Sequence, residues 1–457
     1  MGGGAVILRT ELRRSIAPWA GLAVVAVALG FLFLLSGPWW KTPAPWTAQA
    51  TTAALWVRFL LVFLWPIVVG AGAIQGMRDS RSGMTELLAT TSRPGRHRAA
   101  KLAGAVGGLS AAGFLLVFAV GAVEVLVHGG LFSAGFVPVV GVGLLAVVAG
   151  SWLGLAVGRL LPHPLTAPAL AVLVLVLSML CWTALEPALD SVLPARAGPL
   201  TPALAEPRGS MVTTAASVDA GQAVWFAGLA ATGFLLLSVN SVRARLLSLL
   251  PLVVGAAVAL PLFPASSAEV LTTDSFAAGK VCDGPVCVAE LHRERLAALA
   301  GPGREALAML AKLPDPPTRI EEQTAATFTG DAPRRAPDVV YLDFQQEEKL
   351  LTADAADLRL ELLAGGGVPS CDRFSVVSLP DQAARMITAA YFTGELKMLP
   401  EHSGRWLKKD FGTVEQLWNS FRTLPPQVRL DRVAAARRVL LSCQGDPLAA
   451  LIPGALR

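Results

Sequence analysis

The stretch LAGAVGGLSAAGFLLVFAVGAVEVLV, residues Leu102–Val127, contains 26 residues and a single ionisable side chain, Glu124. A helix of about 20 apolar residues crosses the hydrocarbon core of a bilayer. Inside that core every backbone amide must find its partner within the helix or a closed barrel. The stretch therefore predicts a transmembrane helix.

Other apolar stretches of similar length occur throughout the first 264 residues. We expect spans near 17–36, 55–76, 102–127, 136–158, 165–185, 222–239 and 246–264. The last two are shorter and only Asn240–Arg245 separates them, so they form either two full crossings or a hairpin that dips into the bilayer. The sequence thus predicts an all-α polytopic membrane domain of six to seven transmembrane helices over residues 1–264.

Charge is distributed unevenly along a chain that is 54% apolar and only 16% charged. Residues 1–264 hold 16 Lys and Arg against 8 Asp and Glu, whereas residues 265–457 hold 22 against 25. Anionic lipids and the insertion machinery retain basic residues beside the cytoplasmic leaflet. The basic excess therefore indicates a lipid bilayer as the partner, and it does not indicate nucleic acid.

The positions of the basic residues predict an orientation. With a cytoplasmic N-terminus, the inner segments hold twelve Lys and Arg residues and the outer segments hold four. This asymmetry follows the positive-inside rule. We expect a multi-pass protein of the cell membrane whose seven crossings leave residues 265–457 on the extracytoplasmic side.

Cysteine usage agrees with that side. Four of the five cysteines lie after residue 264: Cys282, Cys287, Cys371 and Cys443. An oxidising compartment would allow them to form two disulfides, with three pairings open, and a Cys282–Cys287 bond is sterically plausible. Four reduced thiols are the alternative. Their spacing lacks the close pairs of a structural zinc site.

The sequence predicts that residues 265–457 form a separate extracytoplasmic domain of mainly helical α+β class. Helical periodicity occurs in 286–300, 304–313, 381–398, 412–422 and 428–442, with a break at Gly301-Pro302-Gly303 between the first two. The segments PDVVYLDF and FSVVSL predict short strands. His292 and Glu294 lack the spacing of an HExxH zinc motif and indicate a solvated helix face.

Motifs for chemistry are missing from the sequence. It contains no GxxxxGK[ST] phosphate loop, no HExxH and no GxSxG. We expect no enzymatic activity, catalytic residue, metal or cofactor in this chain itself. Arg58 and Glu124 lie near span ends, where headgroup anchoring is the favoured interpretation and a salt bridge between them is the alternative.

Glycines four residues apart predict close helix packing on the second, third and fourth spans. The pairs are Gly72 and Gly76, Gly104 and Gly108, Gly150 and Gly154, and Gly154 and Gly158.

The loop between the second and third spans, Met77–Lys101, reads MRDSRSGMTELLATTSRPGRHRAAK. Its apolar stripe falls at positions i, i+3, i+4 and i+7 of a helix: Met84, Leu87, Leu88 and Thr91. The segment Arg93-Pro94-Gly95 ends that helix. Basic residues crowd both ends of the loop, so we expect an amphipathic helix at the cytoplasmic interface.

This layout resembles the type-2 ABC exporter permeases. The stretch RDSRSGMTELLATTSRPGRHRAAK is similar to the family's loop between its second and third spans, at Gly83, Glu86, Leu87, Leu88, Pro94 and Lys101. The resemblance implies the transmembrane subunit of an ATP-driven exporter, paired with a separate ABC ATPase that binds ATP and Mg. It also implies a second permease subunit, as homodimer or heterodimer. The ATPase contact would fall on Met84, Glu86, Leu87, Leu88 and Thr91.

Two features depart from that family. A seventh span and the domain 265–457 extend beyond the usual six spans, and the domain resembles outer domains of actinobacterial membrane proteins. The alternative function is therefore a membrane-anchored extracytoplasmic binding or sensory protein without transport activity.

Overall fold

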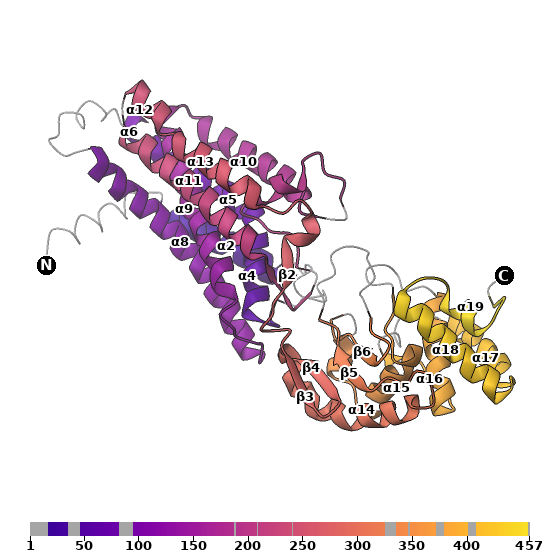
Figure 1. Cartoon of the computed structure of the whole chain (residues 1–457). Helices are drawn as coiled ribbons and strands as arrows, with labels where there is room; N and C mark the ends of the chain where they lie inside the picture. The colour runs from indigo at the N-terminus through magenta and orange to yellow at the C-terminus, as the bar shows by residue number, and fades with distance from the viewer. Residues whose placement is uncertain are drawn as a thin grey trace. The chain divides into compact units, whose positions relative to one another are not determined.

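The computed structural model describes residues 17–34, 46–81, 95–186, 189–207, 209–239, 241–324, 335–345, 348–371, 379–400 and 408–455. The chain divides into two compact units, Met1–Asp274 and Ser275–Arg457 (Figure 1). The division falls ten residues beyond the boundary expected after residue 264. The reason is that strand β2 (Leu271–Thr273) pairs antiparallel with β1 (Val212–Thr214) and so belongs to the first unit.

The first unit is a bundle of helices. They are α2 (Ala17–Leu34), α4 (Ala50–Phe59), α5 (Leu61–Gly76), α6 (Arg78–Arg81), α8 (Gly95–Val127), α9 (Phe136–Leu160), α10 (Thr166–Thr183), α11 (Ala216–Ser238), α12 (Val242–Leu247) and α13 (Leu250–Leu262). Within the described residues, five helical stretches are long and apolar enough to cross a membrane, with α12 and α13 counted together. The number rises to six if α4 and α5 form one span. Helix α2, expected as the first span, contributes a shorter apolar helix.

The second expected span differs from its prediction. The sequence predicted one helix over 55–76, but helix begins at Ala50 and α4 meets α5 at a bend of 56°. Pro66, in the second turn of α5, has no N–H to donate to the carbonyl of Val62. Such a bent pair is either a broken span or a re-entrant loop.

The second unit combines a four-stranded sheet with helices. Its strands are β3 (Lys280–Asp283), β4 (Val286–Ala289), β5 (Arg319–Glu322) and β6 (Val339–Leu342), in the order β3-β4-β5-β6. Strands β4, β5 and β6 are parallel, and β3 is antiparallel to β4. The helices are α14 (Leu296–Leu310), α15 (Ala355–Leu363), α16 (Leu379–Thr393), α17 (Lys408–Arg422), α18 (Pro426–Ser442) and α19 (Pro447–Leu451).

Residues 286–313 depart from the predicted pair of helices. Val286–Ala289 is a strand, a 3-10 turn follows, and α14 continues through Gly301-Pro302-Gly303 without a break. A Cβ on Gly303 would lie 2.8 Å from Val286 and 2.9 Å from Ile320, so glycine lets α14 approach the sheet closely. Packing of the buried face of α14 outweighs the low helix propensity of Gly and Pro.

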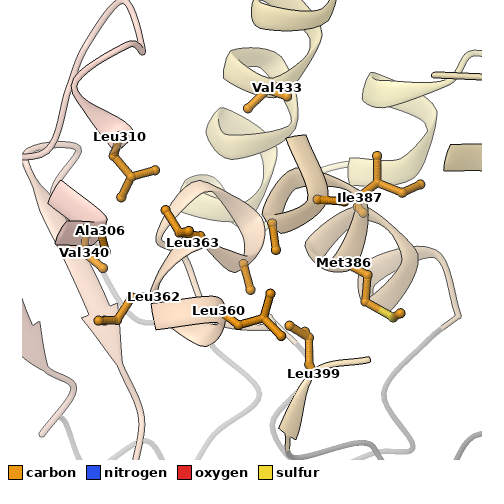
Figure 2. Packing of buried hydrophobic residues seen from close by; sticks show 14 of the residues in the cluster. Ala306, Leu310, Val340, Leu360, Leu362, Leu363, Met386, Ile387, Leu399 and Val433 are labelled. Atoms are coloured by element: carbon orange, nitrogen blue, oxygen red, sulfur yellow. The ribbon is translucent and has the colours of Figure 1, made fainter. Parts of the chain in front are cut away.

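The core of the second unit joins elements far apart in the sequence. Figure 2 shows Leu310 of α14, Val340 of β6, Leu363 of α15, Ile387 of α16 and Val433 of α18 in one cluster. Burying each such side chain contributes about 1.5–3 kcal/mol. The strand predicted for PDVVYLDF is confirmed as β6. Most of FSVVSL lies outside the described residues, and its last residue, Leu379, begins α16.

Candidate functional site

The residues predicted to contact an ATPase lie outside the described residues. Met84, Glu86, Leu87, Leu88 and Thr91 all fall within 82–94. The helices on either side of this segment are described, and they show which part of the bundle carries it.

The segment 82–94 connects helices that meet at one end of the bundle. Helix α5 ends at Gly76 beside Leu155 of α9, and α8 begins at Gly95. Trp152 Nε1 of α9 donates a 2.9 Å hydrogen bond to the carbonyl of Ala103, early in α8. Figure 1 shows α6 and α12 at this same end and β2 at the other. We call this end, where α5, α9 and α11 finish and α8 starts, the basic end.

Basic side chains gather at the basic end. Arg96, His97, Lys101 and Arg243 are exposed there. The guanidinium of Arg159, at the end of α9, donates to the carbonyl of Leu237 at the end of α11. A docking protein would therefore meet a positively charged surface.

Glycines bring α5 and α9 into backbone contact along the half nearest the basic end. A Cβ on Gly72 or Gly76 would overlap the α9 backbone, and one on Gly154 or Gly158 would overlap the α5 backbone. Gly104 and Gly108 of α8 have nothing within 4 Å of that position, so the described residues place no close helix against them. Close packing thus uses the predicted glycines of α5 and α9 but not Gly104 and Gly108, whereas Gly113 of α8 lies against Gly21 of α2.

The opposite end contains a fully buried arginine. Arg58 was predicted to lie among lipid headgroups, and this is wrong because its side chain is 0% exposed inside the protein. Its Nε donates to the carbonyl of Pro202 at 2.9 Å, and its two terminal nitrogens donate to the Val139 carbonyl and to Gln222 Oε1. The sequence alone gave no signal for these three acceptors.

Gln222 extends the Arg58 network to the segment before β1. Its amide nitrogen donates to the carbonyls of Pro199 at 2.9 Å and Thr201 at 3.0 Å. Its oxygen and nitrogen are both used, so the orientation of the amide is fixed. The network therefore ties α4, α9 and α11 to residues 199–202.

Asp219, one turn before Gln222 on α11, provides negative charge near Arg58. Its Oδ2 accepts a 2.6 Å hydrogen bond from the hydroxyl of Thr214 in β1. A buried charge is costly unless its polar groups are satisfied, and the Arg58 guanidinium has three hydrogen-bond acceptors in addition to the nearby Asp219. Oε2 of Glu124, the partner considered for Arg58 from the sequence, instead lies 3.6 Å from Nδ1 of His128, the residue that follows α8.

The cysteines of the second unit form two disulfides. Cys282 pairs with Cys287, directly opposite in the β3–β4 hairpin, and Cys371 pairs with Cys443. The guanidinium of Arg335 donates to the carbonyls of Pro369, Ser370 and Leu440 beside the second bond. These bonds select one of the three pairings that the sequence left open.

His292 is not on a solvated helix face. Its Nδ1 lies 2.6 Å from Glu322 Oε1, and its ring packs against Phe344. The second carboxylate oxygen of Glu322 accepts a hydrogen bond from the main chain of Ala289. Through these two contacts the Glu322 carboxylate joins the end of β5 to the end of β4 and to the turn that follows β4. No group of three or more His, Cys, Asp or Glu residues suited to a metal occurs among the described residues.

Comparison with known proteins gives no relative. No protein-family model, no curated protein and no solved structure matches this chain.

Proposed function

We propose that this chain is the transmembrane subunit of an ATP-driven exporter, in which the segment Met77–Lys101 receives a separate ABC ATPase. The observation that carries the proposal is the setting of this segment. It joins two helices, α5 and α8, which both pack against α9 at an end rich in exposed basic residues.

The mechanism is mechanical. In this proposal, closure of the ATPase pushes the segment Met84–Thr91, for which the sequence predicts an amphipathic helix. Glycine contacts join α5 to α9, and the Trp152 hydrogen bond joins α9 to α8, so these helices move as one group. The Arg159 hydrogen bond joins α9 to α11 as well, and at the far end Arg58 of α4 bonds both α9 and α11, so the motion of the group would reach α4.

The proposal assigns no covalent chemistry to this chain. ATP and Mg bind to the partner ATPase, and a second permease subunit, identical or related, completes the pathway. Large apolar side chains exposed on α10 and α13, such as Leu173 and Val253, suit contact with lipid tails or with that subunit.

Co-purification tests the proposal. The tagged full-length chain should retain an ABC ATPase encoded beside it when extracted in mild detergent. A variant that lacks residues 77–98 should insert in the membrane and lose the ATPase. An ATPase that stays bound to the deletion variant, or a chain that never binds one, would contradict the proposal.

The second candidate is a membrane-anchored extracytoplasmic binding or sensory protein. It is favoured by the second unit, which has its own core and two disulfides. Under this alternative the chain purifies without an ATPase, and export is unchanged when it is deleted.

Both candidates require the second unit to lie outside the cell. After mild reduction, a membrane-impermeant thiol reagent should label Cys282 or Cys371 on intact cells. Labelling that appears only after lysis would contradict the orientation.

A further inference from the structure

Three side-chain oxygens from separate parts of the first unit surround the space in front of Gly135. A Cβ built on Gly135 would lie 3.0 Å from Thr51 Oγ1, 3.2 Å from Asp274 Oδ2 and 3.4 Å from Ser133 Oγ. Thr51 is the second residue of α4, Ser133 precedes α9, and Asp274 follows β2. All three residues are more than nine-tenths buried.

Two of these oxygens have no hydrogen-bond partner within the described residues. The hydroxyls of Thr51 and Ser133 are buried without one. A buried hydroxyl left unpaired costs about 1–3 kcal/mol, so native proteins rarely leave two of them beside each other. A bound group that coordinates oxygen atoms would give both hydroxyls a partner.

Gly135 supplies the space, and its backbone does not require glycine. Its φ of −57° and ψ of −25° are right-handed helical angles that alanine adopts without strain. A methyl group at this position would instead fill the space between the three oxygens. Glycine at position 135 therefore leaves open the space that a side chain would fill.

We propose that Thr51, Ser133 and Asp274 bind a hard cation, for which Ca²⁺ is the fitting ion. Calcium takes oxygen ligands only, tolerates irregular geometry and completes its shell with carbonyls and water. The ion would lie beyond the Cβ position, because that point is at bonding distance from Gly135 Cα, and the three oxygens would have to come within about 2.3–2.6 Å of it. Mg²⁺ demands a near-ideal octahedron and suits this set less well.

The site should be weak. Only one carboxylate faces the space, and α4 and α9 both begin beside it, so the positive ends of two helix dipoles oppose a cation. Sites of low ligand charge in extracellular modules bind calcium with dissociation constants of about 10⁻⁴–10⁻³ M. This range suits an ion that is present at millimolar level outside the cell.

A bound ion would join elements that hydrogen bonds already align. Leu131 exchanges main-chain hydrogen bonds with Ala48 and Ala50, which holds the Ser133 segment beside the start of α4. The main-chain N–H of Asp274 donates to the carbonyl of Met211 at 2.9 Å, which holds the end of β2. The cation would fasten the two regions to each other.

Equilibrium dialysis with radioactive calcium tests the site on the full-length chain, purified in detergent and stripped with EDTA. We expect the wild type to bind one ion per chain at this site and to melt about 2–4 °C higher in 5 mM CaCl₂. G135A and D274N should bind at least tenfold more weakly. G141A is the matched control, because it lies on α9 with open space around its Cβ, and it should bind like the wild type.

Two results would overturn the proposal. One is no calcium binding by the wild type up to 10 mM, which would leave only water between the oxygens. The other is equal binding by wild type and G135A, which would place the ion elsewhere. If G135A fails to fold, Thr51→Val replaces it, since valine keeps the shape and removes the hydroxyl. The assay contains no ATPase, so its outcome is independent of the proposed export function.

Discussion

The guanidinium of Arg58 on α4 donates a 2.8 Å hydrogen bond to Oε1 of Gln222 on α11, across 164 residues of sequence. This bond lies in the interior of the helical unit, where both side chains are 0% exposed. Arg58 therefore fixes the position of α4, the shorter arm of the bent helix pair, against the rest of the bundle.

Replacing Arg58 by Met should destabilise the first unit strongly. The substitution leaves the Gln222 oxygen without its donor and Asp219 without its nearby positive charge. The carbonyls of Val139 and Pro202 also lose their donor, and each buried acceptor left unsatisfied costs about 1–3 kcal/mol. Thermal unfolding in detergent measures the loss. Arg196, which is exposed, provides the control R196M, expected within about 0.5 kcal/mol of the wild type. Equal melting of the two variants would show that the Arg58 network contributes no stability.

Changes in the segment 82–94 should stop export without affecting insertion. E86K reverses the charge beside the predicted apolar stripe, and Leu87→Pro would interrupt the amphipathic helix that the sequence predicts. Transport in vesicles should fall to background in both, while membrane levels stay the same. E11K, predicted on the same side of the membrane but outside the segment, should transport normally. Unchanged transport in both segment variants would refute the coupling role.

The α5–α9 contact should be sensitive to a single methyl group. G158A forces a Cβ into the carbonyl of Ala73, and such overpacking costs about 1–3 kcal/mol. G104A meets nothing within 4 Å, so it should be neutral or raise stability by about 0.4–1 kcal/mol. Melting temperatures of the two variants in the same detergent compare them directly. The reverse order would mean that α5 and α9 are not packed as described.

The two disulfides should differ in their contribution. Cys371–Cys443 closes a loop with a sequence separation of 72, whereas Cys282–Cys287 closes one of 5. Loop closure restricts the unfolded chain more when the loop is longer. The double variant C371S/C443S should therefore melt at a lower temperature than C282S/C287S when unfolding of the second unit is followed. A larger loss from the hairpin bond would contradict this account.

Lowering the pH should weaken the ion pairs that Glu321 of β5 makes with Lys280 of β3 and Arg319 of β5, and should so reduce the stability of the second unit. Burial raises the pKa of Glu321, but hydrogen bonds from Lys280 and Arg319 outweigh it, and the pKa lies below its ordinary value of 4.5. A carboxylate with a lowered folded pKa adds stability above its unfolded pKa, and this contribution is lost as the pH falls through the folded value. E321Q should thus reduce stability at pH 7 and flatten its decline below about pH 4.5. Chemical unfolding at several pH values measures this, with the exposed E395Q as control, and parallel profiles for E321Q and wild type would argue against it.

Several features could be read from the sequence because they depend on local properties. A run of apolar residues such as 136–158 is long enough to cross a bilayer wherever it lies, since a helix satisfies its own backbone. The helices near 381–398, 412–422 and 428–442 followed from periodicity in the same way, and the structure places α16, α17 and α18 there. The even number of cysteines indicated two disulfides but not their pairing.

The remaining features depend on contacts between distant residues. Local patterns placed Arg58 near a span end, but its burial depends on acceptors contributed by Val139, Pro202 and Gln222. The Gly301-Pro302-Gly303 sequence signals a helix break, and only the sheet beneath α14 outweighs that signal. The sequence by itself determined the apolar segments, the basic loop and the cysteine count. The tertiary structure alone decided the disulfide pairing, the glycine contacts of α5 with α9 and the convergence of oxygens at Gly135, because these require residues that only folding brings together.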